Sequence, residues 1–306
     1  MKKWFNQKER SAGAFRLLIL WWIYKFLGKS FLNFVVFFVA LISFIFASEI
    51  RKYQRKYFKV YSEFYSKELK ASLKNLFKHY LSYAYSLADR IEIFSGNLNH
   101  KKIIFANEND KIQLKNDFSK EKGIFFICNH LGNVDAMRAF ITSDIGHKNL
   151  KVNVFMQKNQ TQIFNNFIDA IAIKTPICTY PVEEIGVETA IEIQEKLQKG
   201  EIVFMAGDRI SAQNSSASFL ANFLGHNVEF PIGTFRFAQM CNVPIYFISC
   251  VKIKNDKYKI LLKKFEAENL SKKEMLKKLQ KDFILFLEEH IKDYPLQFYH
   301  FYDMFS

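Results

Sequence analysis

A histidine and an aspartate lie five residues apart in the stretch ICNHLGNVDAMRAF, which covers residues 127–140. His130 follows an apolar run, and Asp135 comes at the expected start of a helix that Asn133 could cap. A neutral imidazole can act as a general base if an acceptor holds its other ring nitrogen. Asp135 could swing back to be that acceptor. The alternative interpretation is an ordinary capping turn.

Two further polar pieces follow apolar runs. Asp208 and Arg209 come directly after IVFMAG, and the stretch FPIGTFRFA contains Pro231, Gly233 and Thr234 at the expected start of a helix. Ligand sites in open α/β sheets lie at the carboxyl ends of strands, and a helix N-terminus offers backbone N–H groups to an oxyanion or a phosphate. For Asp208 and Arg209, a helix cap or a surface ion pair is the alternative.

A nucleophilic serine is not indicated, because the chain has no G-x-S-x-G motif. A base without an enzyme nucleophile must act on a hydroxyl that the substrate brings, which predicts direct transfer, most simply of an acyl group. A metal-dependent hydrolase is an alternative, but it has only His130 and Asp135 as plausible ligands. The four cysteines form no C-x-x-C pair. We therefore predict neither a metal nor another cofactor.

The elements that must position these residues alternate between strand and helix over residues 101–265. Apolar runs at 103–106, 123–128 and 151–156 are typical of strands, and 201–208 is expected to be a strand followed by a turn, whereas 107–122 is expected to be a polar connection. The runs PIYFISCVKI and KYKILLKKF predict a hairpin, and amphipathic helices are expected near 186–200 and 271–292. The fold class predicted is α/β, with a mixed, mostly parallel sheet flanked by helices.

The N-terminal region differs in composition from the remainder. We predict a helical membrane anchor at 1–50, followed by one domain at 51–306 with a helical lead-in at 51–95 and an α/β core at about 100–300. Lys25, Gly28 and Lys29 divide the apolar stretch 13–47 into two pieces. Basic residues flank it on both sides, which favours a re-entrant or in-plane anchor over a clean crossing. A tilted span and a buried pair of core helices are the alternatives.

The chain is strongly basic, with a formal net charge of +14 and an isoelectric point of about 9.4. Such a chain attracts anions: nucleic acid, an acidic carrier protein or an anionic membrane leaflet. No RNA-recognition signature or helix-turn-helix pattern is present, so a nucleic-acid partner is not expected. A membrane surface and an acidic protein remain.

The ordered motifs N-H-L-G-N-x-D, G-D-R and FLGHNVEFPIGTFRFA resemble the lysophospholipid acyltransferase superfamily. The branch most similar includes the bacterial late acyltransferases of lipid A and related acyltransferases of polyene-lipid gene clusters. The resemblance covers roughly residues 100–300, and H-x4-D is its specific part. Phospholipid-making members usually carry E-G-x-R where this chain has A-G-D-R. That difference favours a lipid A-like acceptor over a glycerolipid.

The resemblance implies a role for each matching residue. His130 would deprotonate the acceptor hydroxyl, and Asp135 would hold and charge-stabilise His130. Arg209 would bind a phosphate of donor or acceptor, with Asp208 positioning it, and Gly207 would allow close approach. Pro231, Gly233 and Thr234 would shape the acceptor pocket or an oxyanion site. Asn129 and Asn133 would fix the loop of the histidine, with ordinary turn residues as the alternative.

The resemblance also implies partners and a location. The donor would be a fatty acyl thioester of acyl carrier protein or, less favoured, of coenzyme A, and the acceptor would be a membrane lipid. The expected location is the bacterial inner (cytoplasmic) membrane, with the catalytic domain on the cytoplasmic face. The competing hypothesis is a non-catalytic membrane protein that binds anionic lipid.

Overall fold

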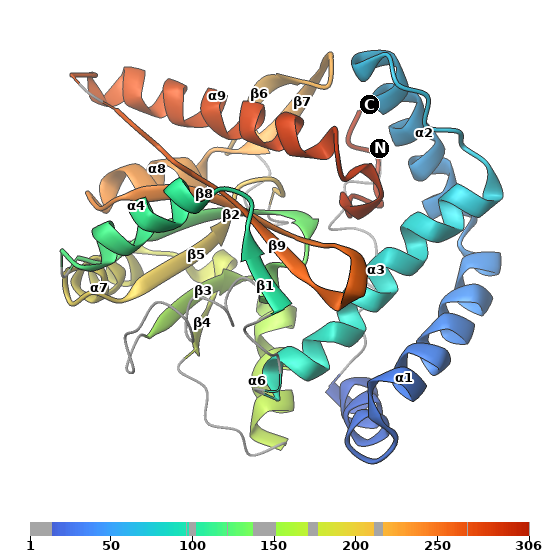
Figure 1. Ribbon diagram of the computed structural model, residues 1–306. Helices are drawn as coiled ribbons and strands as arrows, with labels where there is room; N and C mark the ends of the chain where they lie inside the picture. Colours follow the sequence, from blue (N-terminus) through green and yellow to red (C-terminus); the bar gives the residue numbers. More distant parts are fainter. Residues whose placement is uncertain are drawn as a thin grey trace.

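The chain folds around a seven-stranded mixed sheet flanked by helices, as Figure 1 shows for the computed structural model. The structure describes residues 14–95, 97, 102–120, 122–136, 151–170, 177–210, 217–267 and 269–305. The predicted α/β class with an N-terminal apolar helix is confirmed. Most of the helix predicted after Asn133 lies outside the described residues, as do the basic residues before position 14.

The strands of the sheet are mostly parallel. Their bounds are β1 Ile103–Phe105, β2 Phe125–Gly132, β3 Val152–Met156, β4 Ile177–Pro181, β5 Ile202–Ala206, β8 Ile245–Lys252 and β9 Tyr258–Lys264. They lie in the order β1-β9-β8-β2-β5-β3-β4, and β8 and β9 form the predicted antiparallel hairpin. Strands β6 (Ser218–Phe223) and β7 (His226–Pro231) form a separate hairpin. The central strand β2 therefore has parallel neighbours, β5 and β8, on both sides.

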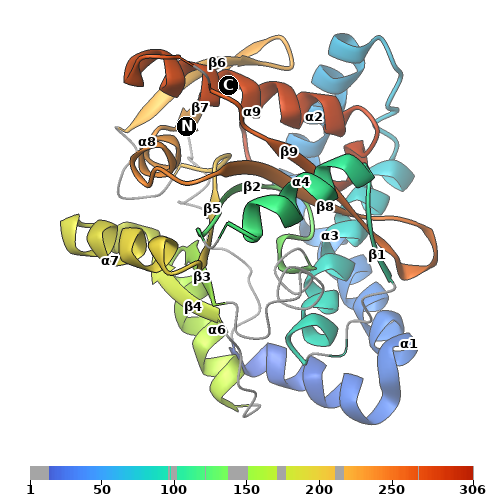
Figure 2. The same ribbon diagram turned by 60° about the vertical axis from the view of Figure 1, so that its left-hand side comes forward.

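Helices cover both faces and one end of the sheet (Figures 1 and 2). Their bounds are α1 Ala14–Phe46, α2 Ser48–Tyr65, α3 Leu73–Phe94, α4 Glu108–Phe118, α6 Lys158–Ala170, α7 Val187–Gln198, α8 Gly233–Met240 and α9 Lys272–Ile291. The prediction of a polar connection over 107–122 was wrong, because α4 occupies most of it. Asn107 caps this helix, and Leu114 and Phe118 are buried against the sheet while most of the other side chains of α4 remain exposed or partly exposed.

The side chains of β2 alternate between two cores. Phe125 and Ile127 pack in the core that includes residues of α8 and α9, whereas Phe126 and Cys128 pack on the opposite face with residues of α4. A strand buried on both faces explains why this run is continuously apolar rather than alternating. The same double burial holds the end of β2 rigidly, and that end carries His130.

Helix α1 consists of two helical pieces joined at Gly28, whose φ of 79° and ψ of 175° are not helical. The predicted division of the apolar stretch is thus confirmed. Leu32, Val36, Ala40 and Phe44 are spaced about one turn apart and are buried, and the helix contacts α3 and α6. Its other side exposes many large apolar residues, including Phe34 and Phe38. The segment Leu17–Phe46 is long and apolar enough to span a membrane.

Candidate active site

The carboxyl ends of β2 and β5 lie side by side because the two strands are parallel neighbours, with Cys128 opposite Ala206. Strand β2 continues to Gly132, so His130 is one of the last residues of this strand and does not lie in a turn after it. Asp208 comes two residues after the end of β5. The sheet order therefore brings together two residues that are 78 positions apart in the chain.

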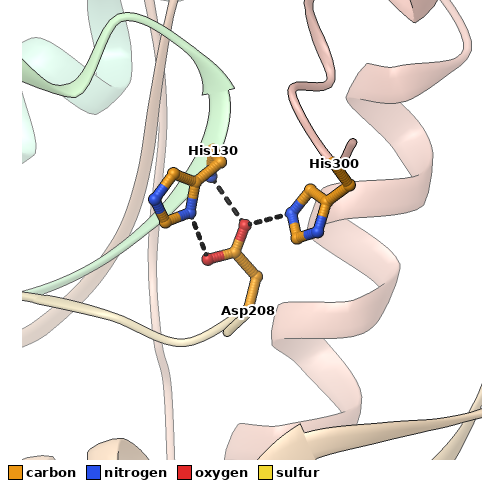
Figure 3. Close-up of side chains that lie close together, drawn as sticks. All are labelled: His130, Asp208 and His300. Atoms are coloured by element: carbon orange, nitrogen blue, oxygen red, sulfur yellow. Dashed lines mark hydrogen bonds and ion pairs between the residues drawn. The ribbon is translucent and has the colours of Figure 1, made fainter. Parts of the chain in front are cut away.

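Asp208 holds His130 through two hydrogen bonds (Figure 3). Its Oδ1 lies 2.9 Å from Nδ1 of the imidazole, and its Oδ2 accepts the backbone N–H of His130 at 2.7 Å. The carboxylate thus fixes the main chain and the ring of the same residue. Because Nδ1 faces the carboxylate, Nε2 is the ring nitrogen of His130 that can accept a proton from a substrate.

A second imidazole lies on the same carboxylate. Nε2 of His300 is 2.8 Å from Oδ2 of Asp208, and its Nδ1 is 2.8 Å from the hydroxyl of Tyr302. Figure 3 shows the two rings on opposite sides of Asp208. The segment that carries His300 is attached to β2, because the backbone N–H of Tyr299 donates to the carbonyl of His130 at 3.0 Å.

Sequence analysis did not identify His300 as a site residue. The segment PLQFYHFYDMF is aromatic and carries a single histidine. Nothing in its local pattern indicates a catalytic site, and aromatic side chains such as Phe298 here pack in the core. A general signal was nevertheless present, because a histidine that is buried in an aromatic-rich segment must find a hydrogen-bond partner.

The three residues differ sharply in exposure. The side chain of Asp208 is 0% exposed and that of His300 is 2% exposed, whereas that of His130 is 29% exposed. Burial alone would raise the pKa of Asp208, but the charge and hydrogen bond of His130, together with those of His300, hold it well below its usual value. The carboxylate is therefore ionised at neutral pH, and His130 is the member of the group that solvent reaches.

His300 is neutral at physiological pH. Burial lowers its pKa to about 4, although the hydrogen bond and charge of Asp208 act in the opposite direction. A neutral ring has one donor and one acceptor. Because an ionised carboxylate only accepts, Nε2 carries the proton and donates to Asp208, while Nδ1 accepts from the Tyr302 hydroxyl.

Asp135 does not occupy the predicted position at Nδ1 of His130, where the structure places Asp208 instead. One carboxylate oxygen of Asp135 lies 2.6 Å from Nε of Arg90 on α3, and the residue is buried. Its backbone N–H donates to Oδ1 of Asn133 at 3.0 Å, which confirms Asn133 as the predicted cap. Helical geometry and the Arg90 contact thus account for the observed position of Asp135.

Asn129 and Asn133 hold the chain on either side of His130 through hydrogen bonds. Oδ1 of the buried Asn129 accepts the backbone N–H of Leu131 at 3.0 Å and the hydroxyl of Ser249 at 2.9 Å. Nδ2 of Asn133 donates to the carbonyl of Ser86 on α3. These bonds fit the predicted role of Asn129 and Asn133 in holding the loop.

Gly132 allows the chain to turn after His130. Its φ is +80°, and a Cβ added there would lie 1.9 Å from the carbonyl oxygen of Cys250 on β8. No other residue type fits this backbone without displacing β8. The turn therefore depends on a glycine that the motif N-H-L-G-N places two residues after the histidine.

The predicted residues around β5 lie close to this group, but several have structural roles. Nη2 of Arg209 donates to the carbonyl of Tyr299 at 2.6 Å, so this side chain also ties down the segment of His300. A Cβ on Gly207 would come 2.8 Å from the side chain of Ile127, so the close approach there is made by the protein core. Asp208 orients the histidines, whereas the resemblance implied that it positions Arg209.

The polar piece at the start of α8 reaches the end of β5. The hydroxyl of Thr234 donates to the carbonyl of Ala206 at 2.7 Å, which fixes the first turn of α8 beside Gly207 and Asp208. Pro231 is buried at the end of β7. Gly233 has open space where a Cβ would lie. The start of α8 is therefore attached to the strand end that carries the site.

A metal ion is the other group that these side chains could hold. Among the described residues, His130, Asp208 and His300 offer ligand atoms within 4.8 Å of one another. Each of the atoms that face each other already takes part in an imidazole–carboxylate hydrogen bond. A cation between them would have to replace both N–H protons on Asp208. The hydrogen bonds account for the cluster without an ion.

The geometry supports general-base chemistry. A partly exposed imidazole, oriented through Nδ1 by a buried ionised carboxylate, is the arrangement that accepts a proton from a hydroxyl or from water. Neither a scan against protein-family models nor a search of the curated proteins gives a match to this chain. The function must therefore be argued from the site and the sequence motifs.

Proposed function

We propose that the chain is a membrane-associated O-acyltransferase that moves a fatty acyl group from an acyl thioester to a hydroxyl of a membrane lipid. The observation that carries the proposal is the contact between Nδ1 of His130 and Asp208, 2.9 Å long, at the carboxyl end of the central strand. The absence of a G-x-S-x-G motif and the resemblance of the motifs to the lysophospholipid acyltransferases support the same reaction class.

The proposed reaction is a direct transfer. Nε2 of His130 removes the proton from the acceptor hydroxyl as its oxygen attacks the thioester carbonyl. The carbon–sulfur bond then breaks, and the thiolate of the donor leaves and takes the proton from the imidazolium. Asp208 stabilises that imidazolium and keeps Nε2 directed at the acceptor.

The donor is proposed to be acyl carrier protein rather than coenzyme A, and the acceptor a lipid A-like or other glycolipid. The formal charge of +14 favours encounter with an acidic carrier protein. The sequence A-G-D-R at residues 206–209 favours the lipid A-like branch of the resemblance. The location that fits both substrates is the cytoplasmic face of a bacterial inner membrane.

Helix α1 is proposed to lie in the membrane interface rather than to cross the bilayer. One stripe, with Leu32, Val36 and Ala40, is buried against the domain. Lys29 adds ion pairs to Glu92 on α3, at 2.5 Å, and to Asp256, at 2.8 Å. A helix attached along its length keeps its apolar outer side parallel to the domain surface, and that side can enter one leaflet.

The test is transfer of a labelled acyl group from acyl carrier protein to total bacterial lipid, catalysed by membranes that contain the full chain. His130→Ala should lower turnover by about 10²- to 10⁴-fold while the protein stays folded and membrane-bound. A His130→Ala protein with full activity would overturn the proposed mechanism. A parallel assay with acyl-coenzyme A distinguishes the two donors.

The second candidate is a non-catalytic protein that binds anionic lipid, which the exposed apolar side of α1 and the net charge also favour. That hypothesis predicts vesicle binding that weakens with salt and does not depend on His130. Binding without transfer from either thioester to any lipid in the extract would favour it over the acyltransferase.

A further inference from the structure

We propose that His300 is a positioning residue of the site: held by Tyr302, it fixes the carboxylate of Asp208 for His130 and takes up part of the charge of that carboxylate. The proposal depends on the proposed function only where it assigns His130 the role of base. The hydrogen-bonded chain from Tyr302 through His300 and Asp208 to His130 is described by three distances of 2.8–2.9 Å.

The first argument is geometric. Without His300, both remaining hydrogen bonds of the Asp208 carboxylate would come from His130, the residue that it orients. His300 adds an attachment outside His130. Its own ring is held independently of Asp208, because Nδ1 is bonded to Tyr302 and the ring stacks on Phe298 with a centroid distance of 4.2 Å.

The second argument is the attachment of the segment to the catalytic strand. Leu131 and Phe298 form an isolated antiparallel bridge, and Tyr299 donates its N–H to the carbonyl of His130. The carbonyl of Tyr299 in turn accepts from Arg209. The segment of His300 thus moves with both strand ends, which is what a positioning element for a residue pair requires.

The third argument concerns charge. An N–H group donated to Oδ2 stabilises the anion and leaves less of its field for His130. Removal of this donor therefore makes the carboxylate a stronger partner of the His130 imidazolium, and the proton on His130 binds more tightly. The other ionisable groups that act on His300 and Asp208 are Arg209, Tyr302 and His79.

The experiment is an NMR titration of the His130 ring in the full chain in detergent, with ¹³C-labelled histidine. His300→Phe, which removes the donor and keeps a ring, should raise the proton-binding constant of His130 about three- to tenfold. His300→Gln, whose amide N–H can reach Asp208 in place of Nε2, should stay within about twofold of the wild type. Tyr302→Phe, which removes one hydroxyl, should shift the constant in the same direction as His300→Phe.

His79→Gln is the matched control, because His79 is buried, lies against the same segment and bonds the carbonyl of Phe298 but not Asp208. It should leave the titration of His130 unchanged. Equal titration of His130 in His300→Phe and the wild type would overturn the proposal, and so would an equal rise in His300→Phe and His300→Gln. If His300→Phe does not fold, Tyr302→Phe decides by the presence or absence of its shift.

The titration tests the positioning role of His300, and the transfer assay tests the proposed function, so either claim can be refuted without the other. The titration needs no substrate, so a protein that transfers no acyl group can still show the shift, and the proposed function alone would then be refuted. Conversely, transfer that requires His130 in a protein whose titration ignores His300 would refute only the positioning role.

Discussion

Two buried neutral histidines should make the fold sensitive to mild acid. Burial lowers the pKa of His79 and of His300 from 6.5 to about 4. In the unfolded chain both rings are in water and return to the ordinary value. The folded state therefore binds fewer protons than the unfolded state between these two pH values, and the free energy of unfolding must fall as the pH falls from about 6.5 towards 4.

The magnitude follows from the two pKa values. A group that shifts from 6.5 to about 4 destabilises the fold by about 2 kcal/mol at pH 5, relative to pH well above 6.5. Together the two histidines account for about 4 kcal/mol, which is a large share of the stability of a typical domain. Asp208 adds nothing in this window, because its lowered pKa removes stability only below about 4.

Urea unfolding of the detergent-solubilised chain, followed by tryptophan fluorescence or circular dichroism at pH 7 and pH 5, measures the effect. His79→Gln should remove about half of the pH dependence, since it leaves only His300 to titrate on unfolding. His226, which is exposed, provides the control: His226→Gln should leave the dependence as in the wild type. A loss of less than about 1 kcal/mol between pH 7 and pH 5 would refute the assignment of both rings as buried and neutral.

Three further predictions concern the site, the turn after it and the anchor. Asp208→Asn should lower acyl transfer about 10⁴-fold by allowing the wrong tautomer of His130. If Asp208→Asn keeps more than a tenth of the wild-type activity while Asp135→Asn is inactive, Asp135 and not Asp208 orients the histidine. Gly132→Ala should lower the free energy of unfolding by at least about 2 kcal/mol, because its Cβ meets Cys250 and its φ is positive. Gly233→Ala, which meets nothing within 4 Å, is the matched control and should melt like the wild type. Phe34→Glu and Phe38→Glu should each weaken flotation with anionic vesicles about tenfold or more. Phe64 is an exposed phenylalanine on α2, and Phe64→Glu should leave flotation unchanged. Equal flotation of all three variants would show that α1 does not enter the membrane.

Much of the fold could be predicted from the sequence because its strands are locally distinctive. The runs that became β2, β3, β5 and β8 are mostly apolar, as is typical of strands buried on both faces. The helix α4 was missed because its surface is mostly polar, and its two buried apolar residues, Leu114 and Phe118, give little periodicity. Strand β4 and the hairpin β6–β7 were also missed, because exposed and partly buried residues break up their apolar pattern.

The site was predicted in part, for a related reason. His130 and Asp208 were both identified, since each follows an apolar run in the sequence, but their pairing depends on β5 lying next to β2. The local spacing favoured Asp135, five residues away, because sequence proximity is visible and sheet order is not. His300 depends on a contact across 170 residues from His130, and no local pattern encodes such a contact.

The attachment of the His300 segment to β2 also affects the order in which the protein becomes competent during synthesis. His130 emerges from the ribosome long before Tyr302, and the chain between them includes β5, α8 and α9. Contacts of such long sequence separation form late, after the intervening loops have been closed. Under the proposed function, a nascent chain that already contains the central strand and the apolar helix α1 would reach the membrane before His300 binds Asp208. Membrane targeting would then precede completion of the proposed active site.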